Sequence, residues 1–153
     1  MAAAPAAPPD EVVSFRVRDM DFCVGIGFVR EIRGWTPATV LPEAQSYVTG
    51  VINLRGTVVA VIDLAARLGL GALDPGPRHV VLIVAIGERL VGLLADAVSD
   101  IMPLDADLVK PLPAQVAERT RAFLGAVVTL PDGRMLRMLD LARILPPSLG
   151  GLA

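Results

Sequence analysis

Short apolar segments that come in pairs around a tight turn are the feature that most constrains this chain, because such pairs form antiparallel β-hairpins. The first pair, 12–17 and 22–25, flanks the turn Asp19-Met20-Asp21. The others are 48–54 with 57–62 around Arg55-Gly56, 80–86 with 90–94 around Gly87-Glu88-Arg89, and 127–130 with 134–138 around Pro131-Asp132-Gly133. In the last turn proline fixes φ and glycine supplies a positive φ. The sequence therefore predicts a mainly β fold.

Helical segments are expected to be short. Asp63 and Asp140 each precede a brief apolar run and are placed to cap a helix, because a side-chain carboxylate accepts from the free N–H groups of the first turn. Gly69 and the prolines after Leu145 are placed to end these two helices. The four predicted helical segments are 42–47, 64–68, 105–109 and 141–145.

Two motifs recur along the chain and indicate an internal repeat. Val29-Arg-Glu-Ile32 is echoed by Val98-Ser-Asp-Ile101, 69 residues later, and Asp63-Leu-Ala-Ala-Arg-Leu68 is echoed by Asp140-Leu-Ala-Arg-Ile-Leu145, 77 residues later. Chance is the alternative, since short matches of common residues arise easily. A repeat predicts two related β modules of roughly sixty residues, too small to be robust alone and therefore packed on each other.

The distribution of proline, glycine and alanine suggests how the chain is divided. We expect a disordered Ala/Pro-rich leader, a single domain of two subdomains, a Gly/Pro-rich linker between the subdomains, and a short tail. These parts are expected at 1–11, 12–146, near 71–78, and 147–153.

Composition removes several classes of function. The chain has one cysteine, Cys23, and one histidine, His79, so neither a disulfide nor the usual clustered metal ligands are available. A net charge of −2 and an aromatic content of 4% disfavour a nucleic-acid partner, and no cofactor motif is present. No apolar run approaches the ~18 residues of a membrane helix, so no direct membrane insertion is expected. A Cys23–His79 catalytic pair is possible but disfavoured, since both positions suit buried strands.

Four segments, in order along the chain, resemble the CheW-like family. They include the hairpin with Asn53-Leu-Arg-Gly56 and Asp63-Leu64, and they are 29–35, 48–68, 90–102 and 133–145. The resemblance covers roughly residues 12–145. It implies two small five-stranded SH3-like β-barrels packed on each other through an apolar interface, with short helices. Ala60, where a proline is usual, and Gly27-Phe28, where polar residues are common, depart from the family's pattern.

The resemblance also implies a role. It is that of a non-enzymatic, cofactor-free adaptor that couples the cytoplasmic tip of methyl-accepting chemoreceptors to the regulatory domain of a CheA-type histidine kinase. The chain would then act in the cytoplasm, at membrane-associated receptor arrays. The alternatives are a paralogue serving a non-motility chemosensory pathway and, less in keeping with the residues, a small β-barrel enzyme or binding module.

Eight protein-binding residues follow from the resemblance. The hairpin tip and the charged residues of the Glu-Ile-Arg-Gly stretch are associated with partner contact, and three aliphatic residues are associated with a groove that receives the receptor tip. Read from the residues alone, the charged groups could be solvated and the aliphatic ones could be core. Trp35 could be an interface anchor or a cap over a barrel end. The eight residues are Val29, Glu31, Ile32, Arg33, Asn53, Arg55, Gly56 and Val98.

Overall fold

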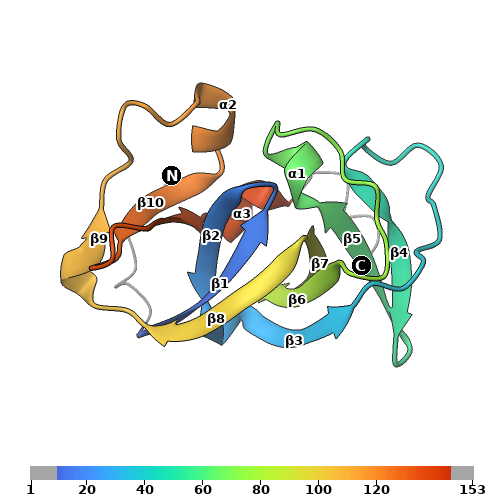
Figure 1. Ribbon diagram of the computed structural model, residues 1–153. Coiled ribbons are helices and arrows are strands. Elements are labelled where there is room, and N and C mark those ends of the chain that lie inside the picture. The colour runs from blue at the N-terminus through green and yellow to red at the C-terminus, as the bar shows by residue number, and fades with distance from the viewer. Residues whose placement is uncertain (1–9, 146–153) are drawn as a thin grey trace.

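Alternating and continuous apolar strands assemble into two β-sheets in the computed structural model, which describes residues 10–145 (Figure 1). The first sheet has six strands in the order β8-β1-β2-β11-β10-β9, and the second has five in the order β3-β6-β7-β5-β4. The strands of the first are β1 (Glu11–Val17), β2 (Met20–Gly25), β8 (Ala97–Pro103), β9 (Val109–Lys110), β10 (Leu124–Thr129) and β11 (Met135–Leu139). Those of the second are β3 (Val29–Gly34), β4 (Val48–Leu54), β5 (Thr57–Asp63), β6 (Val80–Ile86) and β7 (Arg89–Ala95).

The helices within these residues are one turn long, as predicted. Asp63 caps α1, where its carboxylate accepts the N–H of Ala66 at 3.2 Å, and Asp105 caps η2 by accepting the N–H of Asp107 at 2.9 Å. The α-helices are α1 (Leu64–Arg67), α2 (Glu118–Arg121) and α3 (Leu141–Ile144), and the 3-10 helices are η1 (Ile26–Phe28) and η2 (Ala106–Leu108).

Two local predictions were wrong. Segment 42–47 forms turns instead of a helix, with Glu43 at φ 66°, because the backbone of Thr39 bridges to Val51 and the chain must return to β4. Asp140 does not cap α3 through its side chain, because its carboxylate lies 3.2 Å from Nε of Arg143 instead.

The predicted hairpins are confirmed. Arg55 and Gly56 both have positive φ, at 52° and 91°, which is the geometry of the two-residue turn that suits the twist of paired strands. Glycines also take positive φ in the turns β6–β7 and β10–β11, at Gly87 and Gly133. Ala60, the departure in β5, is buried and pairs with Val51 and Val91, so the missing proline does not loosen this strand.

The two sheets repeat one arrangement, which supports the internal repeat. Strands β3-β6-β7-β5-β4 correspond in order to β8-β1-β2-β11-β10, and in both sets the second strand of a hairpin pairs in parallel with a strand from elsewhere, β5 with β7 and β11 with β2. The strand β9, two residues long, is the addition that makes the first sheet six-stranded rather than five-stranded as predicted. The prediction of two related β modules with short helices is confirmed in this form.

The modules are not consecutive in sequence. The N-terminal hairpin β1–β2 completes the sheet made by β8 to β11, so the chain crosses between sheets twice, at η1 and at Asp96 between β7 and β8. Segment 71–78, predicted as the linker between modules, instead lies between α1 and β6 beside the five-stranded sheet. In the predicted leader, Glu11 is the first residue of β1, and residues 1–9 lie outside the described part, as does the predicted tail.

One apolar core joins both sheets, as their small size requires. It contains the stacked rings of Phe15 and Phe22, with centroids 6.0 Å apart, together with Ile62 and Leu82 from the other sheet. Trp35 is half-buried against this core and its backbone N–H donates to the carbonyl of His79, which favours the capping interpretation. In residues 10–145 no helix is long and apolar enough to cross a membrane.

Candidate protein-binding surface

The β4–β5 turn presents a charged group that reaches across the five-stranded sheet. Nη2 of Arg55 lies 2.8 Å from Oε1 of Glu31, and Nη1 of Arg33 lies 3.5 Å from the other carboxylate oxygen. The hydrogen bond from Arg55 is the main cause that lowers the pKa of Glu31. Glu31 lies on β3, and Arg55 follows β4 directly. Because β3 and β4 are the two edge strands of this sheet, the Arg55–Glu31 ion pair links the two edges.

The turn that carries Arg55 is held by a neighbouring side chain. Oδ1 of Asn53 accepts the N–H of Gly56 at 2.7 Å, which closes the turn. Gly56 is required by its φ of 91°, since nothing lies within 4 Å of an added Cβ. The Arg55 side chain is 71% exposed, so the ion pair contributes little to stability and chiefly orients the guanidinium.

The predicted aliphatic residues do not share one environment. Val29 and Val98 are half-buried and pack against the main core, whereas Ile32 is 40% exposed. On β3 the expected alternation is inverted, because Glu31 and Arg33 lie on the half-buried side and Ile32 on the exposed side. The structure thus brings together Glu31, Arg33, Asn53, Arg55 and Gly56, while Val98 lies on β8 of the other sheet.

An apolar hollow of about 310 Å³ lies where the two sheets meet, and none of its lining residues was among the predicted binding residues. Phe28, at the η1 crossover, is 47% exposed at this hollow and is the neighbour of Val29. The one sequence signal for it was the departure at Gly27-Phe28 from the family's polar residues. The lining residues are Val24, Gly25, Phe28, Ile86, Gly125, Met138, Leu139, Asp140, Leu141 and Ala142.

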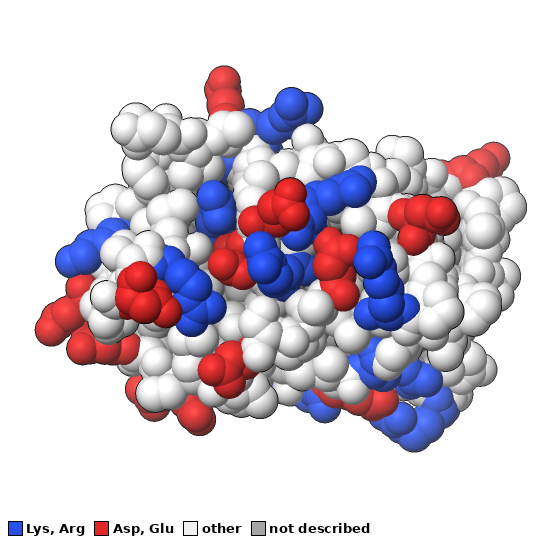
Figure 2. All heavy atoms as spheres, in the orientation of Figure 1, with Lys and Arg blue, Asp and Glu red and all other residues white. Residues whose placement is uncertain are grey.

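The two residues considered for catalysis are separated and structurally engaged. Cys23 is fully buried on β2 in the six-stranded sheet, and His79 is 4% exposed before β6 with Nε2 3.2 Å from Oδ1 of Asp96. No cluster of three metal-ligating residues occurs in the part of the chain described. On the face shown in Figure 2, acidic and basic side chains are intermingled without an extended basic area.

Burial makes the Cys23 thiol unreactive. Desolvation raises the pKa of this thiol from 9.0 to about 12, so very little thiolate is present at pH 8. A thiolate-specific reagent is therefore expected to label the native protein far more slowly than the urea-unfolded chain, and absorbance measures the labelling rate. As the folded pKa exceeds the unfolded one, stability is expected to fall as pH rises from 9.0 toward about 12. Equal labelling rates in the two states would contradict this environment.

Two β modules packed on each other, with an apolar hollow where they meet and a charged hairpin tip on one of them, define a class of small two-module β proteins. Residues 11–147 match the family model described as the CheW-like domain. This chain belongs to the CheW-like family.

Related proteins cover nearly the whole chain. It is 46% identical over 136 residues to "Chemotaxis protein CheW" of Rhizobium meliloti (strain 1021), covering 89% of this chain and 87% of the relative. It is also 46% identical over 131 residues to "Probable chemotaxis protein CheW" of Rhizobium etli (strain ATCC 51251 / DSM 11541 / JCM 21823 / NBRC 15573 / CFN 42), covering 86% of this chain and 84% of the relative.

A solved structure agrees with this fold. The crystal structure of the scaffolding protein TtCheW from Thermoanaerobacter tengcongensis matches with a TM-score of 0.78 and 29% identity, covering 87% of this chain and 90% of that one. The CheW-like fold is therefore confirmed. Family membership also makes the chain a non-enzymatic chemotaxis scaffold, as the resemblance implied.

Proposed function

We propose that this scaffold couples the cytoplasmic tip of methyl-accepting chemoreceptors to the regulatory domain of a CheA-type histidine kinase, in the cytoplasm. The observation that carries the proposal is the presence of two different surfaces on one small domain, the apolar hollow at η1 and the charged tip of the β4–β5 hairpin. The high identity to chemotaxis proteins supports the same assignment.

The apolar hollow suits the receptor. A receptor tip is helical, and an amphipathic helix binds by laying its apolar face into a groove. Phe28 and Ile86 supply apolar side chains at this hollow, while Gly25 and Gly125 keep its walls free of bulk. Val29 follows Phe28 directly, so the predicted groove residue lies beside the hollow.

The charged tip suits the kinase domain. Arg55 is exposed and is pre-oriented by Glu31, and exposed complementary charges set partner choice and association rate. Ile32, although exposed on the same edge strand, points to the opposite face from Glu31 and is not part of this charged tip. A partner with a matching acidic group is the expected occupant.

Replacing Arg55 by alanine is expected to weaken kinase binding about tenfold, the effect of losing one important interface arginine. Folding should be unchanged, because the side chain is exposed. Calorimetry with the purified regulatory domain of a CheA-type kinase from the same genome measures the affinity, and a receptor cytoplasmic fragment is titrated separately.

The internal repeat offers a matched control. Arg134 sits in the equivalent β10–β11 turn, where its side chain is 50% exposed and its Nε lies 2.9 Å from Oδ2 of Asp132. Arg134→Ala should leave both affinities unchanged. Equal weakening by both substitutions would remove the special role of Arg55, and absence of binding by the native protein to both partners would overturn the proposed function.

A further inference from the structure

The internal repeat allows the apolar hollow to be compared with the equivalent place in the other half of the molecule. Residues 140–142 line the hollow and correspond to residues 63–65, where α1 begins. Ile86 also lines the hollow and ends β6, the strand that corresponds to β1, which ends at Val17. The counterpart of the hollow therefore lies between the start of α1 and the end of β1.

Backbone contacts support this correspondence. The N–H of Asp140 donates to the carbonyl of Phe123 at 2.8 Å, just as the N–H of Asp63 donates to the carbonyl of Tyr47 at 2.8 Å. The strand that follows each of these carbonyls, β10 or β4, carries a register shift at its second residue. The two places are therefore built on the same backbone frame, and their differences lie in what occupies them.

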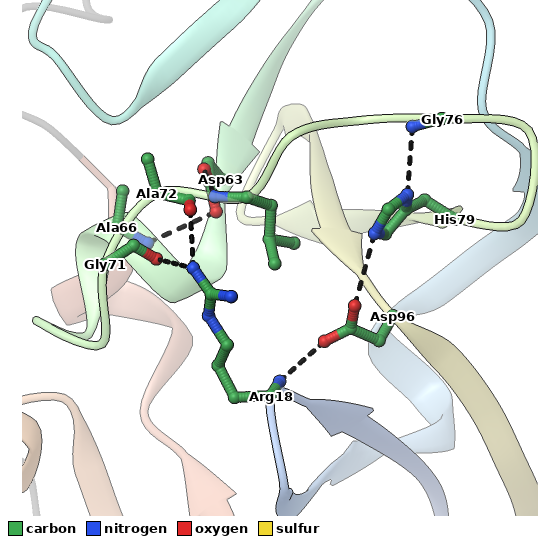
Figure 3. A network of polar contacts seen from close by, with 9 residues as sticks. Arg18, Asp63, Ala66, Gly71, Ala72, Gly76, His79 and Asp96 are labelled. Atoms are coloured by element: carbon green, nitrogen blue, oxygen red, sulfur yellow. Dashed lines mark hydrogen bonds and ion pairs between the residues drawn. The ribbon is translucent and has the colours of Figure 1, made fainter.

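At the counterpart, the chain fills the place with its own residues 71–73. Oδ2 of Asp63 accepts the N–H of Leu73 at 2.8 Å. Nη2 of Arg18, the residue after β1, donates to the carbonyls of the two residues before Leu73, as Figure 3 shows. The Leu73 side chain is buried in the main core. One leucine side chain and its own N–H thus complete the counterpart.

The hollow keeps this frame without the group that fills it. Gly87 stands where the counterpart has Arg18, with φ 63° against 56°, and glycine has no side chain with which to hold a segment. The Asp140 side chain is 35% exposed, and its recorded contact within residues 10–145 is to Nε of Arg143 at 3.2 Å. In the described part of the chain, the hollow therefore has the apolar walls and the carboxylate of its counterpart but neither the leucine nor the N–H.

We propose that the hollow binds a receptor segment that supplies what residues 71–73 supply at the counterpart: a leucine-like side chain for the apolar walls and, beside it, an N–H donor for Asp140. This inference rests on the proposed function, which assigns the hollow to the receptor. Asp140 is the one charged residue among the described residues that line the hollow. A positively charged donor gains most there, because hydrogen bonds between charged groups are the stronger ones.

Arg143 competes with the receptor for Asp140. Its side chain is 54% exposed, and an ion pair so open to water is weak. A donor that the receptor brings to the edge of the hollow is shielded from water by the bound segment, so it replaces Arg143 as the partner of the carboxylate. Removing Arg143 should therefore strengthen receptor binding, which a purely structural role for this pair would not do.

The first test uses the chain's own segment as the probe and needs no receptor. A peptide with the sequence of residues 70–74, acetylated and amidated at its ends, carries the leucine side chain and its N–H together. At millimolar concentration it should shift the amide NMR signals of Gly125, Asp140 and Ala142 in the native protein. The same peptide with Leu73→Ala should not shift them. Absence of shifts with the leucine peptide would overturn the proposal.

The same signals detect two other occupants. Without peptide, they should be the same in the native protein and in a variant with Leu149→Ala and Leu152→Ala, the two leucines that follow residue 145. They should also be independent of protein concentration. A difference in the leucine variant would assign the hollow to the chain's own residues, and a concentration dependence would assign it to a second copy. Either result would overturn its assignment to the receptor.

The second test fills the hollow and measures binding of the receptor cytoplasmic fragment by calorimetry. A Cβ added to Gly125 meets nothing within 4 Å, so the side chain of Gly125→Leu can enter the hollow without straining β10. This variant should bind the receptor fragment at least about tenfold more weakly, as when a central interface contact is lost, and the kinase domain as before. Gly34→Leu, which also has open space around its Cβ but lies on β3 outside the hollow, should leave the receptor affinity unchanged.

The same titrations test the donor for Asp140. Asp140→Ala should weaken receptor binding about tenfold, the effect of losing a hydrogen bond to a charged group, whereas Arg143→Ala should strengthen it about twofold. Asp107→Ala removes an equally negative, exposed side chain from η2 and should change nothing. Unchanged affinity in Asp140→Ala would overturn the proposal. Failure of the native protein to bind the receptor fragment, with the peptide shifts present, would instead overturn the proposed function and leave the hollow a leucine-binding site.

Discussion

Replacing Asp63 by alanine is expected to lower the free energy of unfolding by about 3 kcal/mol, the cost of losing a helix cap and leaving a buried donor unpaired. Asp63 is 5% exposed, and its two oxygens accept the N–H of Ala66 in α1 and of Leu73 in the following segment. Alanine offers neither acceptor, and the site is closed to water. Urea denaturation followed by circular dichroism measures the change as a shift of the midpoint.

The repeat supplies the control for this substitution. Asp140 occupies the equivalent position before α3 but accepts no capping hydrogen bond, and its half-exposed carboxylate faces only Arg143 among the described contacts. Asp140→Ala is therefore expected to cost less than about 1 kcal/mol, as for an exposed ion pair. If both substitutions cost the same, the buried bond to Leu73 does not stabilise the fold as argued.

Replacing Arg67 by alanine is expected to cost about 2–3 kcal/mol, from a lost cation–π sandwich and lost bonds to helix-end carbonyls. Its guanidinium carbon lies 4.2 Å from the ring centroid of Tyr47 and 4.7 Å from that of Phe123. Nε donates to the carbonyl of Ile144 at 2.9 Å and Nη2 to that of Arg143 at 3.1 Å. The side chain thus joins α1, beside one sheet, to the end of α3, beside the other (Figure 1).

Two further variants sharpen this prediction. Arg67→Lys keeps the charge but lacks the planar fork that fits between two rings, so it should recover less than half of the loss. Arg143→Ala removes an exposed arginine of α3 and should change the free energy of unfolding by under about 0.5 kcal/mol. A full rescue by lysine, measured in the same denaturation experiment, would mean that charge alone and not geometry holds the two helices.

Local features were predictable because their causes lie within a few residues. The turn at Arg55-Gly56 needs a glycine at positive φ, and the cap at Asp63 needs a carboxylate before an apolar turn. The failure at Asp140 has an equally local cause, since the residue three positions later is Arg143 where the first copy has Ala66. Arg143 competes with the backbone N–H groups of the helix for the Asp140 carboxylate. This difference between the two copies of the repeat is visible in the sequence.

The interleaving of the sheets was not predictable from the pattern. The parallel pairing of β2 with β11 joins residues more than a hundred positions apart, and no local periodicity encodes it. The resemblance to the CheW-like family, and not alternation, singled out Arg55. On β3 Glu31 is half-buried beside exposed Ile32, and its ion pair with Arg55 joins two edges of the sheet that come together only in the folded chain.

The division of one module between both ends of the chain has a consequence for its biosynthesis. A ribosome releases β3 to β7 as an uninterrupted set, so the five-stranded module has every strand it needs while the C-terminal third is still unmade. The β1–β2 hairpin emerges first yet has no sheet to join until β8, β10 and β11 appear. Because domains fold as their parts emerge, the β1–β2 hairpin is among the last segments to reach its final partners, and its apolar strands are the ones a chaperone would meet.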